Sequence, residues 1–350
     1  MFAQNCWYVA GWLTEFEEGR PHARMVAGER VVLFRTGGGL VALEDRCAHR
    51  LAPLSLGRCE GDTLRCMYHG LRFSADGRCV EIPGQEKIPD NARVKSYPVV
   101  ERHSWAWIWI GEAQADPALI PDAIGLDHPD WALKCGGHLD YAANYQLIND
   151  NLLDFSHLSY VHANSFGAGP EWATSRPVVE ILARGVRVSR WMPRSASSLR
   201  MREARGLSGE PADTFSSYDF LVPGILLLGS ESYPAGTAER YPDRRPDLEP
   251  LSATFSCQAV TPVTDRTSRY FFSWGPRAGP GAEEMALKLL AIADQAFAED
   301  KVMIEAQQLV IDATDRPLVV PTTADKAVII FQRMMARMMK GHTMAAKAVA

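Results

Sequence analysis

Residues 47–70 of the chain read CAHRLAPLSLGRCEGDTLRCMYHG and contain two cysteines and two histidines in a regular pattern. Cys47-x-His49 is followed, after sixteen residues, by Cys66-x-x-His69. With 7 Cys and 9 His among 350 residues, both pairs fall in one such window by chance on the order of 0.003 times. The spacing therefore predicts a metal centre in this segment.

Each half of the motif supplies one cysteine and one histidine, which bears on the kind of centre. Four such ligands can hold a structural zinc ion, although zinc fingers usually pair Cys with Cys and His with His along the chain. A [2Fe–2S] cluster with two thiolates on one iron and two imidazoles on the other uses the same four residues. The arrangement favours the cluster, and structural zinc is the alternative.

The sequence around this motif predicts two domains. Short strands such as VVLFR and LVALE flank Gly37-Gly38-Gly39, which indicates a hairpin, and no convincing helix interrupts the first third. We expect an all-β domain over residues 1–115 and a second domain over 116–350, joined by a proline-containing linker. The second domain combines long strands with one helix from Glu283 to Asp312, so the predicted class is α+β with an antiparallel sheet beside a long helix.

Two polar stretches interrupt the strand pattern of the second domain. The longer one, Arg194 to Ser217, is rich in Arg, Ser and Pro and is expected to be a loop.

Composition excludes several classes of protein. The formal net charge of −5 provides no basic excess, so we expect no nucleic-acid partner. No apolar run is long enough to span a bilayer, and the N-terminal residues do not resemble a signal peptide, so we expect no membrane association. The 7 cysteines are odd in number, which argues against a disulfide framework and for a reducing compartment, the cytoplasm.

A second group of candidate ligands lies in YQLINDNLLDFSHLSYVH, residues 145–162, a helix-like segment. Asp154 and His157 share a helix face, whereas His157 and His162 lie roughly 140° apart around an ideal helix. Both histidines can reach one metal only if the helix ends or bulges between them. Two histidines and a carboxylate commonly hold non-haem Fe(II) with open positions for O2. The alternative is a pair of histidines hydrogen-bonded in a packed interior.

The third ligand is expected on the long helix, which offers four acids, Asp294, Glu299, Asp300 and Glu305. Asp300 lies on the apolar stripe of that helix, three residues after Phe297 and four before Ile304. A carboxylate that faces a core is costly unless it is paired or binds a metal. The stripe therefore selects Asp300, and an acid on the helix surface is the alternative.

These segments resemble a known family. CAHRLAPLS and CMYHGLRF resemble the Rieske motif, and DNLLDFSH-x4-H with the later FAEDK resembles the mononuclear iron motif of the oxygenase component of Rieske non-haem iron oxygenases. NCWYVAGW and YFFSWGPRAG are similar to the branch of vanillate O-demethylase and dicamba monooxygenase. The resemblance implies an N-terminal Rieske domain followed by a helix-grip catalytic domain, assembled as a homotrimer.

The resemblance also assigns residues. It implies a [2Fe–2S] cluster held by Cys47, His49, Cys66 and His69, and a mononuclear Fe(II) held by His157, His162 and Asp300. Asp154 would bridge His69 of a neighbouring subunit to His157, and Asn151 matches a polar position close to the iron. Phe272 and Trp274 are candidate substrate contacts, although aromatic residues on strands are more often core.

The implied activity is that of a terminal oxygenase acting on a small aromatic substrate. It would use O2 and electrons from a separate ferredoxin or flavin reductase, because the chain has no G-x-G-x-x-G after a strand and would use NAD(P)H only indirectly. Oxidative O-demethylation of a methoxylated aromatic acid is the leading prediction. A ring-dihydroxylating or methyl-hydroxylating oxygenase is one alternative, and a Rieske electron-transfer protein is an alternative of another class.

Overall fold

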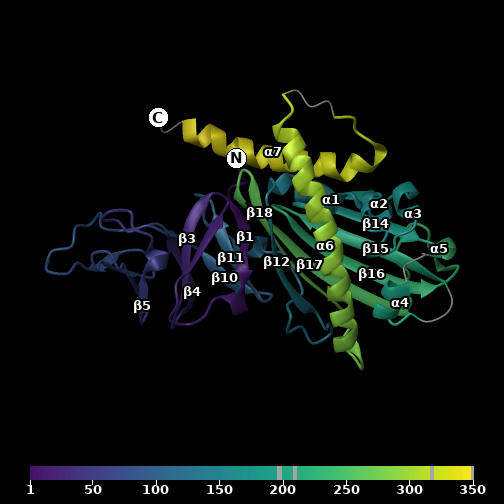
Figure 1. Ribbon diagram of the computed structural model, residues 1–350, viewed down its shortest axis with the longest axis horizontal. Coiled ribbons are helices and arrows are strands. Elements are labelled where there is room, and N and C mark those ends of the chain that lie inside the picture. Colours follow the sequence, from purple (N-terminus) through teal and green to yellow (C-terminus); the bar gives the residue numbers. More distant parts are fainter. Residues whose placement is uncertain (195–198, 208–210, 316–318, 348–350) are drawn as a thin grey trace. The chain divides into compact units, whose positions relative to one another are not determined.

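The computed structural model describes residues 1–194, 199–207, 211–315 and 319–347. The chain divides into two compact units (Figure 1). The first comprises Met1–Ile120 together with Thr261–Thr264, and the second comprises Pro121–Val260 together with Asp265–Ala350. None of the described helices is long and apolar enough to cross a membrane.

Unit 1 is built from three small antiparallel sheets, which confirms the predicted all-β character. The first sheet contains β1 (Cys6–Trp12), β11 (Trp105–Ile110) and β10 (Val99–Arg102). The second contains β2 (His22–Val26), β3 (Glu29–Thr36), β4 (Gly39–Glu44) and β9 (Ser96–Tyr97). The third contains β5 (Arg58–Glu60), β6 (Thr63–Arg65), β7 (Arg72–Ser74) and β8 (Cys79–Glu81). The predicted hairpin is confirmed, since β3 and β4 pair from Val31–Glu44 to Thr36–Gly39.

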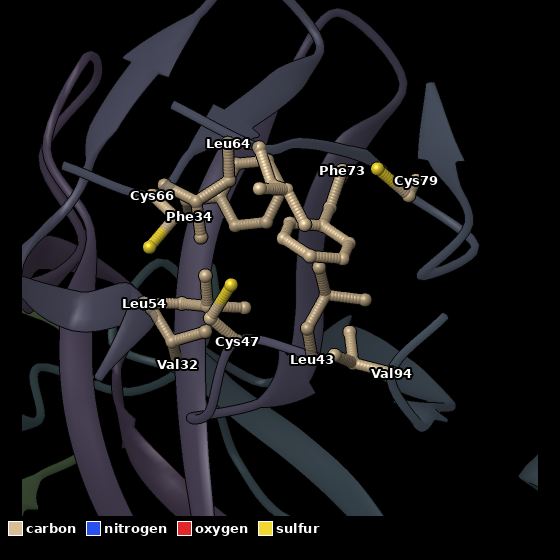
Figure 2. Close-up of a cluster of buried hydrophobic side chains, with 11 residues drawn as sticks. Val32, Phe34, Leu43, Cys47, Leu54, Leu64, Cys66, Phe73, Cys79 and Val94 are labelled. Carbon is tan, nitrogen blue, oxygen red and sulfur yellow. The ribbon is translucent and has the colours of Figure 1, made fainter. Parts of the chain in front are cut away.

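The core of unit 1 reaches the segment that carries the Cys-His motif. Phe34 of β3, Leu64 of β6 and Phe73 of β7 pack together, and Cys47 and Cys66 belong to the same buried cluster. Figure 2 shows Cys47 and Cys66 on the side of this cluster away from Cys79. The core therefore packs against both segments of the Cys-His motif, through Cys47 in one and Cys66 in the other.

Unit 1 extends slightly beyond the predicted boundary at residue 115. A short 3-10 helix, η3 (Pro117–Leu119), is capped by Asp116, whose side chain accepts from the Ala118 amide. The Trp7 indole Nε1 donates to the Asp116 carbonyl over 2.8 Å. These bonds attach the start of the linker to unit 1, which ends at Ile120.

Unit 2 is a seven-stranded antiparallel sheet with helices, so the α+β class is confirmed. The strand order is β12-β18-β17-β16-β15-β14-β13. In chain order the strands are β12 (Lys134–Tyr141), β13 (Val178–Leu182), β14 (Gly185–Met192), β15 (Ala212–Leu221), β16 (Ile225–Pro234), β17 (Ser252–Thr264) and β18 (Thr267–Pro276). The last four residues of β17 belong to unit 1.

The long predicted helix is α6 (Ala282–Asp312), which packs against β18 and β12 (Figure 1). The other described helical segments of unit 2 are α1 (Tyr145–Leu153), η4 (Phe155–His157), α2 (Leu158–Val161), α3 (Glu171–Thr174), α4 (Leu199–Ala204), α5 (Thr237–Arg240), η5 (Thr323–Asp325) and α7 (Lys326–Lys347), and unit 1 also contains η1 (Leu13–Glu15) and η2 (Leu54–Leu56). Helix α4 packs on α6, where Met201 and Ala204 meet Leu289 and Ile292.

The expectation of a loop from Arg194 to Ser217 is wrong in part. Helix α4 lies within this stretch, and β15 already begins at Ala212. The start of β15 buries polar side chains, among them Asp213, Thr214 and Ser216. Because buried strand positions are normally apolar, the usual alternation is absent here and the segment resembles a loop in sequence.

Candidate active site

The helical segment that carries His157 ends just before His162, so the two predicted histidine ligands can approach each other. Asp154 is extended (φ −117°, ψ 98°), and its carboxylate accepts hydrogen bonds from the Ser156 amide (2.8 Å) and hydroxyl (2.9 Å). This cap starts the single turn η4, which continues into α2, and α2 ends at Val161 just before His162. The helix thus ends between the two histidines, as one shared metal requires.

The side chains of His157, His162 and Asp300 converge. The Nε2 atoms of His157 and His162 lie 3.5 and 3.2 Å from Asp300 Oδ1. One ligand atom from each residue lies within 4.8 Å of the others. Asp300 is only 4% exposed, on the buried face of α6, as its place on the apolar stripe predicts. The arrangement matches the two-histidine, one-carboxylate set of non-haem iron.

The other ring nitrogen of each histidine is already engaged. His157 Nδ1 donates to the Asp154 carbonyl oxygen, and His162 Nδ1 donates to Glu299 Oε2 over 2.9 Å. Glu299 also accepts from the Ser165 hydroxyl over 2.6 Å. Hydrogen bonds at Nδ1 fix the tautomer that leaves Nε2 as the metal-binding atom, and such partners typically orient metal ligands. These donors therefore fit a bound Fe(II).

Charge at the site also favours a cation. Among the described residues, neither Lys nor Arg forms an ion pair with Asp300, and its polar neighbours are the two histidines and the Asn151 amide. Burial lowers the pKa of His157, so this imidazole is kept neutral and able to bind a metal. Burial also lowers the pKa of His162, but the carboxylates of Asp300 and Glu299 outweigh it and raise the pKa overall.

The remaining predicted residues of this site lie around the triad. Asn151 Nδ2 donates to Asp300 Oδ1 over 3.0 Å and lies 3.5 Å from His157 Nε2. Asp154 contacts His157 through its backbone carbonyl, whereas its carboxylate caps η4. A bridge from the Asp154 carboxylate to a neighbouring subunit remains a prediction. Glu299 was not identified from the sequence, because it lies off the apolar stripe of α6.

The four residues of the Cys-His motif come together in unit 1. Cys47 and Cys66 are buried, and burial, with the neighbouring Cys66 thiol, raises the pKa of the Cys47 thiol to about 11. His49 and His69 are exposed, with ring centroids 4.5 Å apart. None of the cysteines is in a disulfide. Two buried sulfurs and two solvent-exposed imidazoles suit a Rieske cluster, whose two histidine ligands share one iron.

The iron triad opens into a cavity of about 130 Å³ in unit 2. Its apolar walls include Phe155, Trp172, Trp274 and Phe297. Trp274 thus lines the cavity, and its contact with a substrate stays a prediction. Phe272 is not among the described lining residues; it is buried behind Phe297, with ring centroids 4.8 Å apart.

The cavity also has polar and charged lining residues that the sequence did not single out. Ser216, Ser230 and Thr254 contribute hydroxyl groups from the sheet, and Arg205 contributes a guanidinium from just after α4. The sequence offers many arginines and no periodic signal that separates this one from the rest.

Two family models match the chain. Residues 6–98 match the Rieske [2Fe-2S] domain, and residues 141–341 match the vanillate O-demethylase oxygenase C-terminal domain. The first match supports the cluster over structural zinc. The second covers more than half of the chain and identifies a catalytic domain that an electron-transfer protein would not need.

Individual relatives agree with these matches. The chain is 41% identical to the toluene-4-sulfonate monooxygenase system iron-sulfur subunit of Comamonas testosteroni, over 98% of both chains. It is 33% identical to the vanillate O-demethylase oxygenase subunit of a Pseudomonas species, covering 88% of this chain and 86% of that one. A crystal structure of dicamba monooxygenase bound to 3,6-dichlorosalicylic acid superposes with a TM-score of 0.86 at 28% identity, covering 97% and 98% of the two chains. The chain therefore belongs to the Rieske non-haem iron oxygenases, as a monooxygenase with a [2Fe–2S] cluster and a His-His-Asp iron site in the vanillate O-demethylase branch.

Proposed function

We propose that this oxygenase hydroxylates a methyl group on a small aromatic acid. The observation that carries the proposal is the cavity, which joins the His157, His162 and Asp300 triad to aromatic walls and to one guanidinium. An aromatic ring suits the walls, and an acid suits the positive charge. Vanillate and toluene-4-sulfonate, the substrates named for two relatives, both combine a ring, an acid group and a methyl carbon.

The methyl carbon can be bonded to oxygen or to the ring. Hydroxylation of a methoxy carbon gives a hemiacetal that collapses to a phenol and formaldehyde, which is the O-demethylation expected from the sequence. Hydroxylation of a ring methyl gives an aryl methanol. We favour the ring methyl, since the identity of 41% to the toluene-4-sulfonate enzyme exceeds the 33% to the vanillate enzyme.

Either reaction combines one substrate C–H, one O2, two electrons and two protons into C–OH and water. Bound Fe(II) would supply O2 activation at the triad, with electrons delivered by way of the Rieske cluster. The protein side chains bind and orient. Glu299 and the Asp154 carbonyl hold the two imidazoles, the Asn151 amide donates to Asp300, and the aromatic walls keep water away from the reacting carbon.

We further propose the assembly in which this chemistry takes place. A separate ferredoxin or flavin reductase supplies the electrons from NAD(P)H, in line with relatives named as oxygenase subunits. A homotrimer places Asp154 between His69 of a neighbouring subunit and His157. Seven cysteines without a disulfide favour a reducing compartment, which we take to be the cytoplasm.

Product analysis tests the proposed reaction. The iron-loaded protein, a surrogate reductase and NADH are mixed with toluene-4-sulfonate, 4-methylbenzoate, 4-methoxybenzoate or benzoate, and O2 uptake, formaldehyde and product mass are followed. An aryl methanol from the first two substrates supports the ring-methyl reaction. Formaldehyde in step with O2 uptake from the third supports O-demethylation instead. A cis-diol from benzoate, or no O2 uptake with any of the four, would contradict methyl hydroxylation.

A further inference from the structure

Arg205 lines the cavity, but it has no role in holding the iron or its ligands. Apart from the triad, it is the only charged side chain among the described residues lining the cavity. It follows directly after α4, the helix that packs on α6. A guanidinium in a largely aromatic cavity requires a physical reason, because desolvating a charge is costly.

The described residues do not neutralise this charge. Arg205 is 7% exposed, and no carboxylate in the described part of the chain lies within ion-pair distance of it. Nη2 donates to Ser230 Oγ over 3.1 Å, whereas Nε is buried without a hydrogen-bond partner. Burial lowers the pKa of Arg205 to about 10, so the side chain remains cationic at neutral pH. The guanidinium therefore has both a free donor and an uncompensated charge.

A second buried arginine, Arg190, shows how this chain stabilises a guanidinium for structural purposes. Its guanidinium carbon lies 5.4 Å from the Trp172 ring centroid and 5.9 Å from that of Phe155. It also donates to the Trp172 carbonyl and to the Ser175 hydroxyl, each over 3.4 Å, although its Nε, like that of Arg205, is buried without a hydrogen-bond partner. Arg190 does not line the cavity. Arg205 has no such ring partners among the described residues, and it faces the cavity instead.

The chemistry of the free donor defines its ligand. A planar guanidinium binds the oxygen pair of a carboxylate or sulfonate through parallel N–H groups, with a strength and geometry that an ammonium or a neutral amide lacks. Ser230 fixes the guanidinium through Nη2. The aromatic walls of the same cavity accommodate the ring that carries the acid group.

We propose that Arg205 binds the anionic group of the aromatic substrate, a sulfonate or a carboxylate, and so determines which end of the molecule reaches the iron. The inference rests on the proposed function for the substrate ring and extends it to a specificity-determining residue. It predicts that the acid group contributes to binding whether or not the substrate carries a methyl group.

Binding of a substrate fragment without a methyl group tests this inference separately from the reaction. Benzenesulfonate and its neutral analogue benzenesulfonamide are titrated into the iron-loaded protein by calorimetry, and benzoate and benzamide form a second pair. We expect the anion of each pair to bind at least about tenfold more tightly, the range of a charge-assisted hydrogen bond. Comparison of the two pairs then shows whether sulfonate or carboxylate is preferred.

Variants of Arg205 assign the preference to this residue. R205M should weaken binding of the anions by about tenfold or more and change binding of the neutral analogues by less than about threefold. R205K, which keeps the charge without the planar fork, should fall between R205M and the wild type. R200M is the matched control, because Arg200 lies on α4 but is exposed and bonded to Gln295; it should bind all four compounds like the wild type.

Each other result would overturn the inference. Equal affinity for anion and neutral analogue in the wild type, or a preference that persists in R205M, removes the anion-binding role. An equal loss of affinity for the anion and its neutral analogue in R205M, with cluster absorbance and iron content unchanged, makes Arg205 structural.

If R205M does not fold, R205Q takes its place, since Gln keeps a donor for Ser230 and lacks the charge. The two proposals can fail separately. If methylated acids are turned over but anions bind no more tightly than their neutral analogues, the proposed reaction stands and the role of Arg205 does not. If anions bind more tightly but no substrate is turned over, the role of Arg205 stands and the proposed reaction does not.

Discussion

Single residues decide how tightly the catalytic iron is held, and Glu299 is the least expected of them. It accepts from His162 Nδ1 and from Ser165, so it orients a metal ligand without touching the metal itself. E299A should lower iron affinity by about 10- to 100-fold, as is typical when the partner of a ligating histidine is removed. Iron content after dialysis against a chelator, with cluster absorbance as the internal reference, measures the effect. D294A, which removes an exposed acid from the same helix, should retain iron like the wild type.

Asp154 combines two roles that a conservative substitution separates. Its carboxylate caps η4 through Ser156, and Asn is an equally good cap, so D154N should keep the fold, the iron and the cluster. Turnover should nevertheless fall by at least about tenfold, because the proposed link between subunits loses its charge. D154A should also lose about 1 kcal/mol of stability with the cap. Wild-type turnover in D154N, measured as O2 uptake, would remove the proposed bridging role.

The residues that the sequence predicted well are those whose signal is local. The motif spacing locates Cys47 and His69, and the apolar stripe of α6 selects Asp300 over its neighbours. Glu299 and Arg205 give no such signal, since each is defined by a partner far along the chain: His162 for one, and Ser230 for the other. The hydrophobic periodicity of a helix or strand indicates which face is buried. It does not indicate which side chains from different elements form hydrogen bonds with each other.

At the scale of elements, the close packing of strand β12 against a side chain of β18 can be tested by a substitution. Strand β12 shifts register against β18 between Cys135 and His138, and a Cβ at Gly136 within this shift would overlap the Phe272 ring. G136A should therefore lower the free energy of unfolding by about 1–3 kcal/mol, as overpacking does. G279A is the control, because a Cβ there meets nothing within 4 Å. Thermal unfolding of both variants measures the difference, and equal melting temperatures would show that the ring moves aside without cost.

Element types were predictable where the hydrophobic pattern is regular. Helix α6, with neither Gly nor Pro over its 31 residues, lies almost where the sequence places it. The start of β15 was missed because polar residues occupy its buried positions. Of Asp213, Thr214 and Ser216, only Ser216 is among the described residues that line the cavity, whereas Asp213 accepts hydrogen bonds from the Arg194 and Ala238 amides. The prediction thus failed where buried strand positions carry polar side chains, and the strand pattern there no longer follows from core packing.

For the whole molecule, iron content tests both centres together. The fully loaded protein should contain about three iron atoms per chain, two in the cluster and one at the triad. H162A should contain about two, with the absorbance of the cluster unchanged, because only the triad loses a ligand. H128A, in a loop outside both sites, should keep all three. Loss of cluster absorbance in H162A would mean that the two centres do not assemble independently.

The path of β17 has a consequence for biosynthesis. Its end, Thr261–Thr264, completes unit 1: the Thr261 hydroxyl donates to the Val9 carbonyl over 2.7 Å, and the Pro262 carbonyl accepts from the Ala27 amide over 2.7 Å. Domains usually fold in order as they leave the ribosome. Here two backbone groups of the first domain gain their partners only after most of the second domain has been translated. A fragment that stops at Ile120 would lack these two hydrogen bonds, so the N-terminal domain should be less stable alone than within the whole chain.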